Sequence, residues 1–183
     1  MNRPGVFRQL LSEIEDPLMN SLTETVKNNF GLGPPPSRAD LVHFDGFDEL
    51  DKKHAIEEFL GKTTEDVARA LSENRFGTQS DIEDIFVMEP AGYQYYLAPY
   101  LIQVLRNETD DSEDLQLAGF VISTVSEIIR VRGVVAFTQG QIATLLSLCS
   151  YLVQRCEQEE GEDIWAQPLL KDLKSIEARL TTE

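Results

Sequence analysis

Residues 90–106, PAGYQYYLAPYLIQVLR, decide the fold class. Apolar side chains recur in this segment at relative positions 0, 3, 4, 7, 8 and 11, which is the spacing of one helix face. The residues of this face are Tyr93, Tyr96, Leu97, Tyr100, Leu101 and Val104. Pro90 suits the first position of the helix, and Pro99 inside it predicts a kink. The alternative is an extended segment over residues 93–97, because Tyr93, Tyr95 and Leu97 also alternate.

Further segments after this one also predict long helices. Residues 115–132 are apolar almost all round, which is typical of a central helix, although their β-branched content also fits a strand. Gly133 suits the end of this segment. Thr138 and Gln141 have the spacing of a capping box, and apolar residues follow them in near-heptad spacing. A last helix is expected over residues 168–180.

Prolines organise the N-terminal part of the chain. Asp16 and Pro17 suit the cap and first position of a helix that closes at Phe30, and an earlier helix is expected from Pro4. Gly31-Leu32-Gly33-Pro34-Pro35-Pro36 then predicts an extended connector.

We therefore expect an N-terminal helical arm (1–30), a Gly/Pro linker (31–36) and a helical domain (37–183). The predicted fold class is all-α, a single-domain helical bundle of about seven or eight helices with an N-terminal helical arm.

Composition excludes several classes of protein. The chain has 183 residues with 32 acidic and 16 basic side chains, so its formal charge is −16. Phosphate binding needs Lys and Arg, so nucleic acid is not expected as a partner. No apolar run reaches the length of a membrane span, and the N-terminus lacks the apolar core of a signal peptide. Cys149 and Cys156 are seven apart on a predicted helix, too far to bridge, and reduced cysteines indicate the cytoplasm.

No complete catalytic or metal-binding pattern is present. A Gly-x-Ser-x-Gly motif is missing, and the glycines at 31 and 33 are followed by prolines, which have no N–H for a phosphate. The acids from Asp45 onward lack the EF-hand spacing, and Asp51 with His54 lacks the second carboxylate–histidine pair of a di-iron site. We therefore expect no catalytic residue, no metal and no cofactor.

Two features suggest a surface for a protein partner. Tyr95 lies off the apolar stripe, which makes it a candidate interface residue rather than a core residue. Residues 108–114 and 157–163 each hold five acids and no base. The candidate partner-binding residues are Tyr95, Asp110, Asp111, Glu113, Asp114, Glu157, Glu159, Glu160, Glu162 and Asp163. The alternative for both acidic runs is a solvated interhelix loop.

The two acidic runs are expected at the same end of the bundle. This expectation treats the helices over 115–132 and 138–156 as antiparallel neighbours joined by a short connection. Ten acids would then form one negative end, which would speed the encounter with a basic protein.

Residues 92–101, GYQYYLAPYL, resemble the aromatic-rich helix of a family of uncharacterised bacterial proteins. In that family a Tyr-Leu-Pro-Ala-Tyr-Leu helix is followed, after an acidic loop, by a helix with a Thr-x-x-Gln cap, to which Thr138 and Gln141 correspond. The family's Pro-Ala order stands here as Ala98-Pro99. The resemblance implies an all-α cytoplasmic protein and carries no known activity, so it supplies no functional residues.

Two functions remain open from the sequence. The first is a non-enzymatic acidic protein that binds a basic partner, for instance an inhibitor or immunity-type protein. The second is a small-ligand-binding protein or enzyme whose site is assembled from dispersed residues, such as His54, its neighbouring acids and the tyrosine cluster. The oligomeric state is not indicated by any pattern.

Overall fold

The structure, a computed structural model, describes residues 17–42, 49–73, 84–106, 112–158 and 166–182, and it omits the side chains of 112–116, 156–158, 166–170 and 182. Every regular element in this part of the chain is helical, apart from one isolated antiparallel bridge between Val42 and Met88. The all-α prediction is confirmed. In chain order the elements are α2 (Pro17–Asn29), α3 (Arg38–Leu41), α4 (Glu49–Phe59), α5 (Thr64–Ser72), α7 (Pro90–Arg106), α8 (Ser112–Arg132), the 3₁₀ turn η1 (Val134–Ala136), α9 (Gln139–Gln158) and α10 (Ala166–Thr182).

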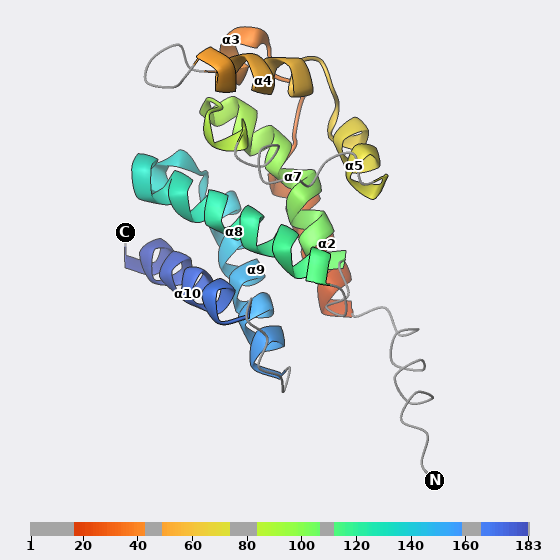
Figure 1. The fold of residues 1–183 in the computed structure, drawn as a ribbon. Helices are drawn as coiled ribbons and strands as arrows, with labels where there is room; N and C mark the ends of the chain where they lie inside the picture. The colour runs from red at the N-terminus through yellow and green to blue at the C-terminus, as the bar shows by residue number, and fades with distance from the viewer. Residues whose placement is uncertain (1–16, 43–48, 74–83, 107–111, 159–165, 183) are drawn as a thin grey trace.

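Helix α7 lies at the centre of the fold and packs against α2, α3, α5 and α8 (Figure 1). It is one helix from Pro90 to Arg106 that includes Pro99, so the extended alternative for residues 93–97 is wrong. The predicted apolar face is confirmed, because Tyr93, Tyr96, Leu97, Tyr100, Leu101 and Val104 are all buried. The apolar spacing and the burial of that face agree, although Gly92 and Pro99 are poor helix formers.

Helices α8, α9 and α10 form the C-terminal part of the bundle. Residues 115–132 lie within helix α8, which excludes the strand alternative. Helix α10 packs against both α8 and α9, whereas α8 and α9 make little direct contact in the described part of the chain. The expectation that α8 and α9 are antiparallel neighbours is therefore wrong. The short connection through η1 lets the chain turn, but α8 and α9 each pack against α10 instead of against one another.

Helix α2 belongs to the same core as the rest of the molecule. It packs against α7 and α9, and its residues Leu22 and Val26 are buried together with Phe30. The Phe30 ring lies edge-on to Phe137, 6.3 Å between centroids. The described part of the expected N-terminal arm is thus an integral layer, because its apolar face finds partners across the proline linker. The helix expected from Pro4 lies outside the described residues.

Several helix ends follow the predicted local chemistry. Gly133 closes α8 with φ 76°. Thr63 caps α5 with Asp66 as its reciprocal partner, and Thr138 and Gln141 form the expected capping box at the start of α9.

Candidate functional site

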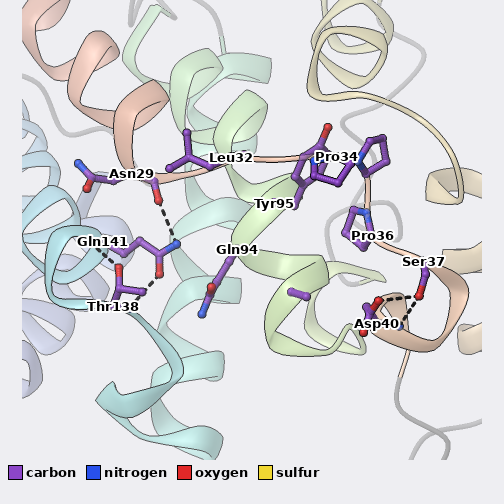
Figure 2. A pocket seen from close by; sticks show the side chains of 13 residues that line it. Asn29, Leu32, Pro34, Pro36, Ser37, Asp40, Gln94, Tyr95, Thr138 and Gln141 are labelled. Atoms are coloured by element: carbon purple, nitrogen blue, oxygen red, sulfur yellow. Dashed lines mark hydrogen bonds between the residues drawn. The ribbon is translucent and has the colours of Figure 1, made fainter.

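A cleft of about 640 Å³ lies where the proline linker crosses α7 near the start of α9 (Figure 2). Three parts of the chain form it: residues 29–40, the first turns of α7, and the cap of α9. Its lining consists of Asn29, Gly31, Leu32, Pro34, Pro35, Pro36, Ser37, Asp40, Ala91, Gln94, Tyr95, Thr138 and Gln141. Its volume is within the usual range of small-molecule and peptide pockets.

Gly31 fixes the linker against α7. Its N–H donates to the carbonyl of Gln94 at 3.1 Å, and its φ of 68° is a left-handed value that favours glycine. A Cβ at this position would lie 2.9 Å from Thr64 Cγ2 and 3.3 Å from the carbonyl oxygen of Tyr95. Glycine is therefore needed both for the turn and for the close approach of two backbones.

The start of α9 is fastened to the end of α2 beside the cleft. Gln141 Oε1 accepts from the N–H of Thr138 at 2.9 Å, and Gln141 Nε2 donates to the carbonyl of Asn29 at 3.0 Å (Figure 2). One side chain thus caps its own helix and satisfies the carbonyl at the end of another. The capping box was predicted, but its bond to residue 29 was not visible in the local pattern.

The 3₁₀ turn before α9 is held by two residues of α7. Tyr93 Oη donates to the carbonyl of Ala136 at 2.9 Å, and Gln94 Nε2 donates to the same carbonyl at 2.7 Å. Burial raises the pKa of Tyr93 to about 12, and the guanidinium of Arg132 over its ring opposes this shift. The tyrosine therefore stays a neutral donor at physiological pH.

Tyr95 is buried, contrary to the expectation that it lies on the exposed surface. Its side chain is 6% exposed, and its ring packs edge-on to Tyr96 with centroids 4.9 Å apart. Figure 2 shows the side chain extending from α7 to the proline linker beside Pro34. No described residue forms a hydrogen bond with its hydroxyl group. Because the linker covers this face of α7, a residue off the apolar stripe is still enclosed.

The lining offers several hydrogen-bond acceptors. Asn29 Nδ2 donates to the carbonyl of Thr25, and the side-chain amides of Gln94 and Gln141 are also engaged with carbonyls. The prolines have no N–H. Asp40 is the one charged side chain of the lining, and no lysine or arginine belongs to it. Ser37 Oγ donates to Asp40 Oδ2 at 2.6 Å, which orients the carboxylate.

The alternative hypothesis of an enzyme or ligand-binding site requires His54, its neighbouring acids and the tyrosine cluster to lie together, and the structure does not place all of them together. His54 Nδ1 lies 2.5 Å from Asp84 Oδ2, and the Asp84 side chain is buried. The tyrosines do not join this pair. Tyr96 Oη donates to the carbonyls of Phe59 and Lys62 at 2.7 and 2.8 Å, and burial raises the pKa of Tyr96 well above its usual value. Both of its bonds serve to fasten α7 to the end of α4.

The acidic candidates lie at or beyond helix ends. Glu113 and Asp114 are in the first turn of α8, and Glu157 is in the last turn of α9. The rest of the partner-binding candidates, Asp110, Asp111, Glu159, Glu160, Glu162 and Asp163, are outside the described residues.

The negative charge is unevenly distributed along the chain. The described residues include 17 acids and 13 bases, a formal charge of −4, whereas the whole chain carries −16. The remaining residues therefore hold 15 acids and 3 bases, and seven of those acids belong to the runs 108–114 and 157–163. Several acids of the described helices have a basic partner nearby, such as Glu127 with Arg130.

The described residues contain no cluster of three or more His, Cys, Asp or Glu side chains that could hold a metal ion. Glu49 and Asp51 lie in the first turn of α4, where the helix dipole favours acids. Cys149 is buried and free, and burial raises the pKa of its thiol to about 12. In this part of the chain no helix is both long enough and apolar enough to cross a bilayer.

Comparisons with known proteins add no relative: no family model matches the chain, and no curated protein or solved structure is significantly similar to it.

Proposed function

We propose that the protein is a non-enzymatic acidic protein whose partner is a basic protein. The observation that carries this proposal is the uneven distribution of charge along the chain: the described residues carry a formal charge of −4, and the remaining residues carry −12. A uniform acidic surface would serve solubility alone. Concentrated charge produces a directional field that steers an oppositely charged partner.

The arrangement of α8 and α10 supports the proposal that the two acidic runs form one negatively charged end of the helical bundle. These two helices pack side by side and run in the same direction in Figure 1. Glu127, near the end of α8, lies close enough to Arg179, near the end of α10, for their charges to interact. The run 108–114 leads into the start of α8, and the run 157–163 precedes the start of α10. Both runs are therefore attached to the same end of this helix pair.

The described residues also favour binding over catalysis. The hydroxyl groups of Tyr93 and Tyr96 are engaged with buried carbonyls, and their raised pKa values keep them neutral. We propose a cytoplasmic location as well, because Cys149 is buried and forms no disulfide bond. The bacterial origin that the family resemblance implies is part of the same proposal.

The test is affinity capture with the full chain from a lysate of the source cell at low salt. We expect retained proteins to be enriched in high isoelectric points and to be released by moderate salt. A variant with Asp110 and Asp111 changed to Asn, and Glu159 and Glu160 changed to Gln, should lose them.

A second variant supplies the matched control, because it changes four exposed acids of the described helices: Glu24, Asp51, Glu57 and Glu65, each to its amide. Its total charge change is identical, so it should retain the partner. If the acidic-run variant keeps the same proteins with the same salt dependence, the proposal is wrong.

A further inference from the structure

We propose that the cleft beneath the proline linker binds an arginine side chain of the basic partner. This inference rests on the proposed function and assigns the contact point that the acidic runs do not provide. The runs attract a basic surface at long range, whereas a cleft with fixed walls can select one side chain of it.

Tyr95 provides the first argument. Its side chain is 6% exposed and lines the cleft, yet no described residue bonds its hydroxyl group. The hydroxyl oxygen itself is not among the fully enclosed side-chain atoms that lack a partner in the described part of the chain, so a ligand in the cleft can reach it. A ligand with N–H donors would supply one, and a planar cation would also be attracted to an aromatic ring.

Asp40 provides the second argument, from a different element. Its Oδ2 accepts from Ser37 Oγ, which leaves Oδ1 without a bond from any described residue. The cleft contains this carboxylate and no basic side chain among the described residues, so its charge is complementary to a cation. The three prolines add carbonyl groups but no N–H.

The chemical groups of the lining are complementary to an arginine side chain. A guanidinium has five donors in a plane and no acceptor, which suits a lining rich in acceptors. Leu32, Ala91 and the proline rings offer apolar surface for the aliphatic part of the side chain. The cleft of about 640 Å³ exceeds one side chain, so the adjoining backbone of the partner is accommodated as well.

The walls of the cleft are held in place before any ligand binds. The linker is fixed by the bond from Gly31 to the carbonyl of Gln94, and the end of α2 by the bond from Gln141 to the carbonyl of Asn29. A preorganised site loses less entropy on binding than a flexible one.

The experiment is an NMR titration of the full chain with N-acetyl-arginine methylamide. N-acetyl-citrulline methylamide, which has nearly the same shape and no charge, is the matched ligand. We expect saturable shifts at residues 31–37, 91–95 and 138–141 with the arginine compound, and at least tenfold weaker binding of the citrulline compound. Equal binding of the two compounds, or shifts confined to other regions, overturns the proposal.

Three variants test the assigned residues. Asp40→Asn should lower the affinity for the arginine compound at least fivefold. Tyr95→Phe should lower it about two- to fivefold, because one hydrogen bond to a charged group is lost and water partly replaces it. Asp51→Asn makes the same chemical change at an exposed first-turn acid outside the cleft, so its affinity should stay within twofold. If Asp40→Asn and Asp51→Asn behave alike, the cleft is not the site.

The result of the arginine titration can be distinguished from the result of the affinity capture that tests the proposed function. The variant with four neutralised acids in the two runs should still bind the arginine compound at physiological salt. Failure of the titration with successful capture of a basic partner rejects the cleft alone. Binding of the arginine compound without capture of any basic partner rejects the proposed function and leaves a small guanidinium ligand as the occupant.

Discussion

Three tyrosines within four residues of α7 have three different roles. Tyr93 holds the turn before α9, Tyr96 holds the end of α4, and Tyr95 leaves its hydroxyl group without a bond from any described residue. Successive helix residues point in directions about 100° apart, so neighbours in sequence reach different parts of the molecule. The composition of this segment indicates a core, but only the bond partners separate structural hydroxyl groups from an available one.

Removal of single hydroxyl groups should show this difference in stability. Tyr96→Phe deletes a donor that serves two carbonyls at 2.7 and 2.8 Å in the core. We expect a loss of about 1–3 kcal/mol in the free energy of unfolding. Tyr95→Phe should change it by less than about 0.5 kcal/mol, because no bond to a described residue is lost. Urea denaturation followed by circular dichroism measures both, and equal losses would contradict these assignments.

The raised pKa of Tyr93 predicts a pH dependence at the alkaline end. Its pKa is about 12 in the folded protein, above the usual tyrosine value of 10.0, because the side chain is buried. Between these values the unfolded chain loses the tyrosine proton and the folded chain keeps it, so stability is present below pH 10 and falls as pH rises toward 12. Tyr93→Phe should show a shallower fall than the parent chain when the melting temperature is measured across this range.

Gly31 and Gly33 form a matched pair for backbone effects. Both have left-handed φ values, 68° and 88°, but only Gly31 has atoms within 4 Å of an added Cβ. Gly33→Ala should cost roughly 1–2 kcal/mol for the backbone conformation alone. Gly31→Ala adds the contacts with Thr64 and the carbonyl of Tyr95, so we expect it to cost at least about 1 kcal/mol more. A smaller loss at Gly31 in thermal unfolding would mean that the linker is not pressed against α7.

At the scale of elements, local signals gave the helices but not their partners. The capping box at Thr138 and the glycine at 133 are short-range chemistry, and both predictions are confirmed. The cleft depends on bonds between distant residues, such as Gln141 to Asn29 and Gln94 to Ala136. A side chain that satisfies its local motif gives no sign of a second bond 112 residues away, so the site was not predictable.

The antiparallel pairing of α8 and α9 was predicted from their short connection, and it failed for a related reason. The connection sets how far apart the helix ends can be, but it does not decide which apolar face is better covered. Helix α10 carries Leu173, Ile176 and Leu180 on one buried face and packs against both. A third helix thus displaced the direct contact that loop length alone favours.

The double role of Gln141 can be separated by one substitution. Gln141→Glu keeps an oxygen to accept from the N–H of Thr138, but it removes the Nε2 donor and places a carboxylate against the carbonyl of Asn29. We expect a loss of about 1–3 kcal/mol in chemical denaturation, despite the favourable helix dipole. Gln139→Glu, an exposed change in the same first turn, should be neutral or slightly stabilising. Equal effects would show that only the cap matters.

At the scale of the whole molecule, the fold and the proposed function depend on different parts of the chain. The described helices bury their apolar faces around α7, and the described residues carry a formal charge of −4. The other −12 of the formal charge belongs to residues outside the described part of the chain. Apolar spacing therefore predicted the fold class, whereas the proposed function depends mainly on acids that the structure does not describe.

The unity of this body can be tested at α2, which the proline linker separates in sequence from the rest. Val26 and Phe30 are buried against α7 and α9 rather than in a separate arm, so α2 should open only when the whole molecule unfolds. In native-state hydrogen exchange, we expect the most protected amides of α2 to match those of α7 within about 1 kcal/mol. If α2 were an independent arm on a flexible linker, its amides would exchange far faster than those of α7. They would show the weak protection that is typical of frayed segments. Val26→Ala should lower the protection of both helices together, whereas Leu18→Ala, at a side chain that is 51% exposed, should leave both unchanged.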